Sequence, residues 1–134
     1  MFGEDFILGQ KIGTIDAKGR IVLPKFTYAQ GDDQISLFYS KDKEHLKIFL
    51  FERIKKMLEL LQDRQLRTAD INFMREIQEQ INLIHESYIE TSYIDNQRRI
   101  HIPSDIREEL NLDKSVHLLG GTEYSLPCLK IYKI

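Results

Sequence analysis

The chain has 134 residues, of which 42% are hydrophobic and 30% are charged, and its formal net charge is −2. This composition is too apolar for a disordered chain, and the length suits one compact domain or two small fused ones. Cys128 is the only cysteine, which excludes both an intramolecular disulfide and a thiolate cluster for a metal ion.

The sequence contains no apolar run of the roughly 18 residues that a bilayer-spanning helix needs. Glu4 and Asp5 interrupt the N-terminus early, which does not fit a secretion signal. We therefore expect a cytoplasmic protein without a membrane partner. The slightly negative charge does not by itself indicate nucleic-acid binding, because phosphate contacts need locally concentrated Lys and Arg.

Short strands separated by turn-forming residues are predicted from about residue 6 to residue 49. The turn formers include Gly19, Pro24 and the loop at 31–33, and apolar stretches at 35–39 and 46–49 have the character of strands. The segment 26–29 is a poor helix former, so we expect at most one helical turn there.

Two amphipathic helices are predicted in the middle of the chain. The first runs from Phe51 to about Leu66, with apolar residues at helical spacing at Phe51, Ile54, Leu58 and Leu61 and with Glu52, Lys55, Lys56 and Glu59 facing outward. The second begins near Asp70, a plausible N-cap. Its apolar stripe consists of Ile71, Met74, Ile77, Ile81, Ile84 and Tyr88. The short polar link between them predicts a helical hairpin.

A short third helix is predicted after Pro103. Ser104 has the chemistry of an N-cap and is followed by acidic residues that favour a helix start, namely Asp105, Glu108 and Glu109. Asn111 tolerates the left-handed conformation and should end this helix after Leu110. Strands are then predicted at 116–119 and 129–132, and the Gly120 and Gly121 pair between them is interpreted as a loop.

A ten-residue pattern occurs twice, at 15–24 and at 94–103. Each copy reads Ile, Asp, three variable residues, Arg, Ile, one residue, an aliphatic residue and Pro. Similar strand-like stretches follow both copies, which indicates a duplication. The predicted organisation is therefore a first repeat at 1–50, a helical hairpin at 51–88 and a second repeat at 89–134.

The start of each copy predicts a tight turn. Asp16 to Gly19 fits a type I turn closed by a left-handed glycine, with Asp16 accepting hydrogen bonds from amides two or three residues later. Arg98 takes the glycine position in the second copy, where a non-glycine residue costs about 1 to 2 kcal/mol. Either the turn tolerates this strain, or the guanidinium faces an anionic partner, with Arg99 and Gln97 available to hydrogen-bond base edges.

Cations concentrate at the two turns, whereas much of the acidic charge lies in the central helices. Asp16 with Arg20, and Asp95 with Arg99, can form intramolecular salt bridges that fix the turns, can present guanidinium groups to a partner, or can do both. The candidate DNA-binding residues are Lys18, Arg20, Lys25, Gln97, Arg98 and Arg99. The residues expected to structure the turns are Asp16, Gly19 and Asp95.

Other kinds of site have little support in the sequence. The four histidines, His45, His85, His101 and His117, are scattered without the spacing of metal ligands. The sequence has no recognisable frame for a Ser/His/Asp triad or paired carboxylates, and no glycine loop that would cradle a phosphate. We expect no metal, no cofactor, no small-molecule substrate and no enzymatic activity.

The repeated motifs carry a family resemblance. The segments 1–3, 15–24, 94–95, 99–103, 106–108 and 118–121 together resemble the MraZ family, whose two SpoVT/AbrB-like repeats each carry an Asp-x-x-x-Arg motif. Arg98 in place of the usual Gly, and Tyr132 where Trp is common, depart from the family pattern. By position, the basic residues of the motif correspond to Lys18, Arg20 and Arg99.

The resemblance implies an α+β fold in which two swapped-hairpin units, at about 6–49 and 89–134, pack into a double-psi, barrel-like core with the helical hairpin inserted. It also implies a cytoplasmic, nucleoid-associated repressor that binds double-stranded DNA. Such a protein assembles as a homo-oligomeric ring on tandem promoter repeats near cell-division and cell-wall genes.

Two other classes of protein are alternatives. An AbrB-like antitoxin or protein-interaction module would carry a disordered acidic tail to wrap its partner, whereas this chain ends in a predicted strand. A small enzyme is the third class. Because a unit of about forty residues is below the size that folds unaided, the two repeats are expected to share one core. Two small basic turns on an acidic subunit would bind DNA poorly, so the chain is expected to oligomerise through repeat and helix contacts.

Overall fold

The computed structural model of the chain describes residues 10–24 and 33–134. Eight strands and three helices lie in these residues, and all of their strand pairs are antiparallel. The predicted α+β class is confirmed. Lys25, the segment 26–29 and the start of the first predicted repeat lie outside the described residues.

Each copy of the repeat contributes four strands. The first copy supplies β1 (Gln10–Thr14), β2 (Arg20–Val22), β3 (Gln34–Tyr39) and β4 (Leu46–Leu50). The second supplies β5 (Tyr88–Tyr93), β6 (Arg99–His101), β7 (Ser115–Glu123) and β8 (Leu126–Lys133). Helices α1 (Phe51–Arg67) and α2 (Ile71–Ser87) lie between the copies, and α3 (Ser104–Glu109) lies within the second.

The two copies exchange strands. A six-stranded sheet has the order β1-β7-β8-β4-β3-β5, and β2 pairs with β6 in a separate two-stranded ribbon. The first strand of each copy therefore pairs with the third strand of the other. The register is equivalent too, since Thr14 lies opposite Ser115 and Gln34 opposite Tyr93. Exchanging the copies reverses the strand order without altering any pairing, so the β structure has an approximate internal two-fold axis.

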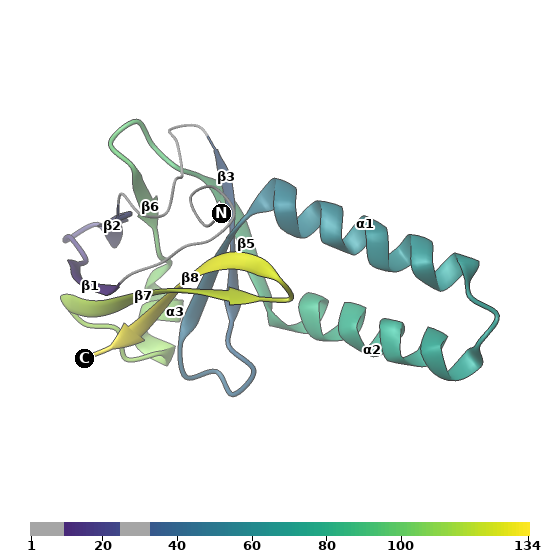
Figure 1. The fold of residues 1–134 in the computed structure, drawn as a ribbon. Coiled ribbons are helices and arrows are strands. Elements are labelled where there is room, and N and C mark those ends of the chain that lie inside the picture. Colours follow the sequence, from purple (N-terminus) through teal and green to yellow (C-terminus); the bar gives the residue numbers. More distant parts are fainter. Residues whose placement is uncertain (1–9, 25–32) are drawn as a thin grey trace.

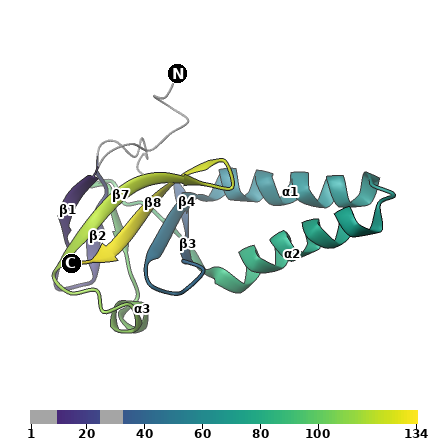
Figure 2. The ribbon, with the colours of Figure 1, turned by 60° about the horizontal axis from the view of Figure 1, so that its bottom comes forward.

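One apolar core lies between the ribbon and the six-stranded sheet. Both copies supply it, the first through residues such as Ile21 and Leu37 and the second through Ile100, Ile102 and Leu129, all fully buried. Helix α3 closes this core at the end seen at the bottom of Figure 2, with Ile106 facing inward. Burial of each such side chain contributes about 1.5 to 3 kcal/mol, and neither copy could bury its own share alone.

The helical hairpin projects from the sheet on the side away from the ribbon (Figure 1). The predicted helix starts are confirmed, and the Asp70 carboxylate accepts hydrogen bonds from the amides of Asn72 and Phe73. A second, smaller apolar cluster joins the base of the hairpin to the sheet; it consists of Phe38, Phe49, Ile54, Ile84 and Cys128. Among the described residues, no helix has the length and apolar character that crossing a bilayer requires.

The predicted apolar stripe of α2 is only partly correct. Ile77, Ile81 and Ile84 are buried, but Ile71 is 70% exposed and Met74 is also exposed. Tyr88 does not belong to the helix, because α2 ends at Ser87 and Tyr88 is the first residue of β5. Helical spacing predicts which face of a helix is apolar. It does not predict how far along that face another element packs. Since the hairpin reaches beyond the sheet, the outer part of the stripe remains open to solvent.

Two further predictions about the second copy need correction. Helix α3 has Pro103 as its N-cap and no side-chain cap bond, so Ser104 is the first helical residue and not the cap. The Pro103 carbonyl accepts the first helical hydrogen bond, from the Arg107 amide at 3.0 Å, and the fixed φ of proline favours this entry. Asn111 has the predicted left-handed conformation, with φ of 54°.

Gly120 and Gly121 lie within strand β7, not in a loop. They pair with Leu129 and Cys128 of β8. The hairpin instead turns at Tyr124 and Ser125, whose φ angles are both positive as in a two-residue type I′ turn. Because the chain turns only at Tyr124 and Ser125, the pairing of β7 with β8 continues through both glycines.

Candidate nucleic-acid interface

The first turn is organised by the Asp16 side chain. Its Oδ1 accepts hydrogen bonds from the amides of Lys18 at 2.9 Å and Arg20 at 2.8 Å, and its Oδ2 accepts one from Arg20 Nε at 2.9 Å. The Gly19 amide donates to the Asp16 carbonyl at 3.0 Å, and Gly19 has φ of 81°. The predicted left-handed glycine is confirmed, while the amides that the carboxylate binds are two and four residues later.

The second turn repeats this arrangement around Asp95. The carboxylate accepts hydrogen bonds from the Gln97 amide at 2.9 Å, the Arg99 amide at 2.8 Å and Arg99 Nε at 2.8 Å. Arg98 takes the place of Gly19 with φ of 61°. The second turn thus keeps the left-handed geometry and the strain that a non-glycine residue brings to it.

Both aspartates are held in the ionised form. The backbone amide of Arg20 lowers the pKa of Asp16, with its guanidinium and the Lys18 amide adding to the effect, and Arg99 and Gln97 do the same for the pKa of Asp95. The expected intramolecular salt bridges are confirmed. The arginines are only 31% and 23% exposed in their side chains, so the turns hold them in fixed positions.

Each paired arginine retains hydrogen-bonding capacity. The bonds to Asp16 and Asp95 use Nε, and within 10–24 and 33–134 the terminal amino groups of Arg20 and Arg99 have no hydrogen-bond partner. A guanidinium has five N–H donors in a fixed fork. Each side chain can therefore stay paired with its aspartate and still donate to a phosphate or a base edge.

Arg98 makes a contact of a different kind. Its terminal amino group donates to the Pro24 carbonyl at 2.8 Å, and the side chain is half-buried. The Leu23 amide also donates to the Arg98 carbonyl, at 2.8 Å. Arg98 of the second copy thus attaches to the end of the first copy's ribbon strand, so its guanidinium contributes to the packing of the two copies.

Strands β2 and β6 place the two turns at opposite ends of one ribbon. Ile21 pairs with Ile100 at the centre, and both side chains point into the core. Because side chains alternate along a strand, the opposite face carries the flanking residues. These are Arg20, Val22, Arg99 and His101. This outer ribbon face continues into the exposed Lys18 and Gln97 at the turns.

The outer ribbon face carries side chains that can bind an anion or a base edge. A two-stranded β-ribbon fits the major groove, arginine recognises guanine edges and phosphates, and Gln can pair with adenine. The ribbon lies at the left of Figure 1, at the end of the molecule away from the helical hairpin. The hairpin therefore does not cover it within the subunit.

Three residues of this region were not identified from the sequence. Val22 is 57% exposed and lies opposite Arg99, and the exposed His101 lies opposite Arg20. Arg107 of α3 supports the first turn, since its Nε donates to the Ile102 carbonyl and its terminal nitrogen lies beside Gly19. Val22 and His101 each occupy the second position after the motif arginine, which was visible in the sequence. That each lies opposite the motif arginine of the other copy depends on pairing between the copies.

No group of three or more His, Cys, Asp or Glu side chains in the described part of the chain is placed to hold a metal ion. No family model matches the chain, and a search of curated proteins finds no match. The geometry and charge of the ribbon are therefore the basis for assigning a function.

Proposed function

We propose that the protein is a sequence-specific DNA-binding transcriptional regulator, a repressor of the MraZ type, that inserts the β2–β6 ribbon into the major groove. The observation that carries this proposal is the symmetric outer ribbon face, which presents Arg20 and Arg99 at equivalent positions about one axis. A duplex site has its own local two-fold axes, so a symmetric ribbon can meet related half-sites on both strands.

The exchange of strands between the copies supports a swapped-hairpin, AbrB-like arrangement. In that arrangement, each motif hairpin packs on the other copy, and the ribbon closes the sheet into a double-psi, barrel-like core. The observed pairing of β1 with β7 and of β5 with β3 has this character. The repeats at 1–50 and 89–134 then form one binding unit, interrupted by the hairpin at 51–88.

A single subunit would bind DNA weakly. Arg20 and Arg99 are each offset by an aspartate, and the exposed turn cation Lys18 has Gln97 as its uncharged counterpart. Repeating the ribbon around a homo-oligomer gains roughly 10² to 10⁴ in avidity when the spacing matches the DNA. Tandem promoter repeats near cell-division and cell-wall genes, bound by a ring on the nucleoid, fit this requirement.

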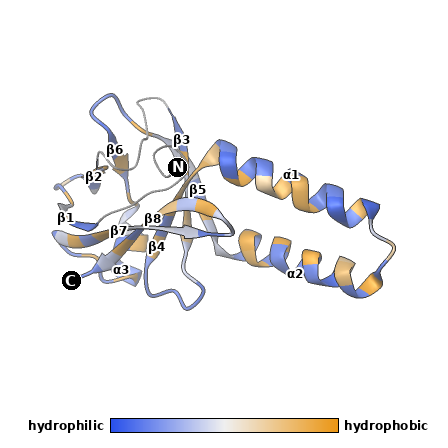
Figure 3. Ribbon diagram, in the orientation of Figure 1, coloured by the Kyte–Doolittle hydropathy of each residue, from blue (hydrophilic) through white to orange (hydrophobic). Residues whose placement is uncertain are grey.

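The helical hairpin supplies a surface for such an assembly. Its outer half carries exposed apolar side chains, namely Leu60, Leu66, Ile71, Phe73 and Met74. Figure 3 shows hydrophobic positions recurring along both helices. Helix α1 carries five basic and three acidic residues, whereas α2 carries one basic and three acidic residues. The two helices thus have opposite net charge, which favours contact between α1 of one subunit and α2 of the next.

The test is binding of the purified full chain to duplex DNA that contains tandem repeats, followed by fluorescence anisotropy over a range of salt concentrations. We expect affinity to fall steeply with salt, and Lys18→Gln together with Arg20→Gln to weaken binding. Lys133→Gln, at the exposed end of β8 and outside both the ribbon and the hairpin, is the charge control and should bind as the parent does. Equal binding by the ribbon variants and the parent would refute the proposal.

The alternative function is an AbrB-like antitoxin or another protein-interaction module. The exposed apolar side chains of the hairpin favour it, because such patches mark interaction surfaces. The two functions differ in outcome. A pure interaction module would show salt-independent, negligible affinity for every duplex tested, and its association would depend on Leu66 and Phe73 and not on the ribbon.

A further inference from the structure

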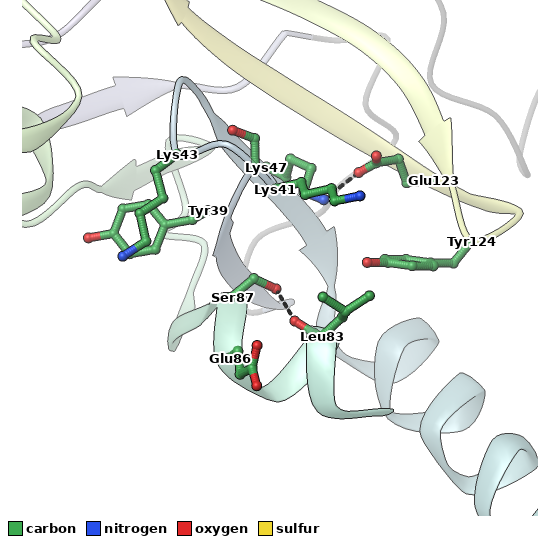
Figure 4. Close-up of a pocket in the computed structure, with 10 residues that line it drawn as sticks. Tyr39, Lys41, Lys43, Lys47, Leu83, Glu86, Ser87, Glu123 and Tyr124 are labelled. Carbon is green, nitrogen blue, oxygen red and sulfur yellow. Dashed lines mark hydrogen bonds and ion pairs between the residues drawn. The ribbon is translucent and has the colours of Figure 1, made fainter. Parts of the chain in front are cut away.

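A pocket of about 350 Å³ lies where the base of the helical hairpin meets the sheet, away from the ribbon (Figure 4). Its walls come from the β3–β4 turn, the last turn of α2 and the β7–β8 turn. The lining residues with distinctive chemistry are Tyr39, Lys41, Lys43, Lys47, Glu86 and Tyr124. The volume lies in the range of small-molecule sites.

The wall of the pocket contains a buried lysine. Lys47 is only 4% exposed, lies opposite Lys130 in the centre of the sheet and forms an ion pair with Glu123. Replacing a buried ion pair with apolar residues is often neutral or stabilising, because both charges lose their hydration. Stability alone therefore gives no general reason for an ion pair at this position, whereas a ligand with negative charge would benefit from a fixed cation there.

Two more lysines approach the same pocket from the β3–β4 turn. The Ser40 hydroxyl fixes this turn by accepting hydrogen bonds from the amides of Glu44 and His45. Lys43 has φ of 58° and places its Nζ 5.3 Å from the centroid of the Tyr39 ring. The lining therefore carries three lysines against two carboxylates, Glu86 and Glu123, of which Glu123 is paired with Lys47. The pocket therefore has an excess of positive charge.

The opposite wall is a flat aromatic ring. Tyr124 occupies the β7–β8 turn with φ of 53°, and its ring centroid lies 5.6 Å from Lys47 Nζ. Figure 4 shows the ring at the far side of the pocket from Tyr39, across from Lys41. A half-exposed ring beside cations can stack on a planar heterocycle. Glu86 lies below, on α2, where its carboxylate can accept hydrogen bonds from hydroxyl groups.

We propose that this pocket binds a mononucleotide. The phosphate lies beside Lys41 and Lys47, the base stacks on Tyr124, and the ribose hydroxyls donate to Glu86. Cationic amines, a stacking ring and an acceptor for hydroxyls are the three kinds of group that a nucleotide needs. The site is independent of the proposed DNA contact, because it shares no residue with the ribbon.

The test is isothermal titration of the full chain with adenosine 5′-monophosphate, with adenosine and with inorganic phosphate as comparison probes. We expect saturable binding of the nucleotide below about 1 mM, and weaker binding of both fragments. Lys41→Gln, at an exposed rim position, should weaken nucleotide binding about tenfold, and Tyr124→Leu should bring the affinity down to that of phosphate. Lys55→Gln, outside the pocket, should leave it unchanged.

Three results would overturn the proposal. The first is no saturable binding of the nucleotide by the parent protein. The second is equal affinity for adenosine and its monophosphate, or an equal effect of Lys41→Gln and Lys55→Gln. The third is loss of nucleotide binding in Lys18→Gln, which would assign the nucleotide to the ribbon. These three results concern nucleotide binding only, so they can be obtained even if the protein does not bind DNA in the anisotropy experiment.

Discussion

The two turns of the ribbon share one hydrogen-bond scheme but differ at the residue that closes it. The first turn uses Gly19 at φ of 81°, and the second uses Arg98 at φ of 61°. The first turn relies on Arg107 of α3 for support, whereas the second extends its own guanidinium to the Pro24 carbonyl. The aspartate therefore determines the geometry of the turn. The residue at the closing position can differ between the copies, according to the groups that lie near it.

The largest expected effect is at Gly19. A Cβ added there would lie 3.0 Å from the Ile102 carbonyl oxygen and 2.8 Å from a terminal nitrogen of Arg107. With the left-handed backbone included, Gly19→Ala should reduce the free energy of unfolding by about 2 to 3 kcal/mol. Urea denaturation measures this. Gly121→Ala is the control, because its new Cβ makes only ordinary contacts, and similar losses for both variants would contradict the explanation.

The next effect is the acid sensitivity that both turns share. The pKa of Asp16 and of Asp95 is lowered in the folded protein. Ionisation of these carboxylates therefore stabilises the fold above their unfolded pKa of about 3.9, and this stabilisation is lost as the pH falls through the folded values. Thermal unfolding midpoints measured from neutral to acidic pH should show a loss below about pH 4.

Single substitutions test whether the two turns contribute equally to the loss of stability in acid. Asp16→Asn and Asp95→Asn should each flatten the acid part of this profile to a similar degree, because the two carboxylates accept equivalent bonds. Asp63→Asn, on the exposed surface of α1, should retain the profile of the parent. A strong effect at only one of the two turns would show that the second turn is not mechanically equivalent to the first.

A smaller effect is expected at Arg98. Arg98→Gly relieves a left-handed strain of about 1 to 2 kcal/mol, but it removes the bond to Pro24, worth about 1 kcal/mol, and frees the unfolded backbone. The unfolding free energy should change by less than about 1 kcal/mol as these effects offset one another. A much larger loss in urea denaturation would mean that the contact between the copies outweighs the strain.

The smallest effect on stability is expected at Lys18 and Gln97, which occupy equivalent exposed positions. Gln97→Lys gives the second turn the cation of the first, and Lys18→Gln removes it. The slope of log affinity for DNA against log salt concentration should shift by about one for each phosphate that the new lysine binds or the lost lysine releases. The two variants should shift it in opposite directions. Unchanged slopes for both would show that the tips of the turns do not touch the phosphates.

Local features of the fold were predictable from the sequence, and the pairing between the copies was not. The Asp16 turn, the left-handed Gly19 and the Asp70 cap depend on neighbouring residues, so their patterns predict them. The ribbon depends on pairing between residues about eighty positions apart, and no local period indicates which strand a partner belongs to. The pairing of Gly120 within β7 was missed because the turn chemistry at Tyr124 and Ser125 is unusual.

The residues of the candidate site likewise fall into those that the sequence indicated and those that only the strand pairing revealed. Arg20 and Arg99 were identified from the repeated motif, and the structure places both on one face. His101 and Val22 gained significance only through the register of β2 against β6. For Arg98, the sequence showed the strained position but not the Pro24 carbonyl that its side chain reaches.

The internal two-fold axis has a consequence for how such a protein can change. In a symmetric homodimer every substitution occurs twice, so a residue must suit both of its environments at once. Joining the two halves in one chain removes that constraint. Position 98 can carry arginine while position 19 stays glycine, and the helical hairpin can be inserted only once in the chain. Because the helical hairpin occurs once, it makes an otherwise symmetric subunit asymmetric. Contacts through the hairpin would then join unlike surfaces of neighbouring subunits, head to tail, and close as a ring or continue as a filament.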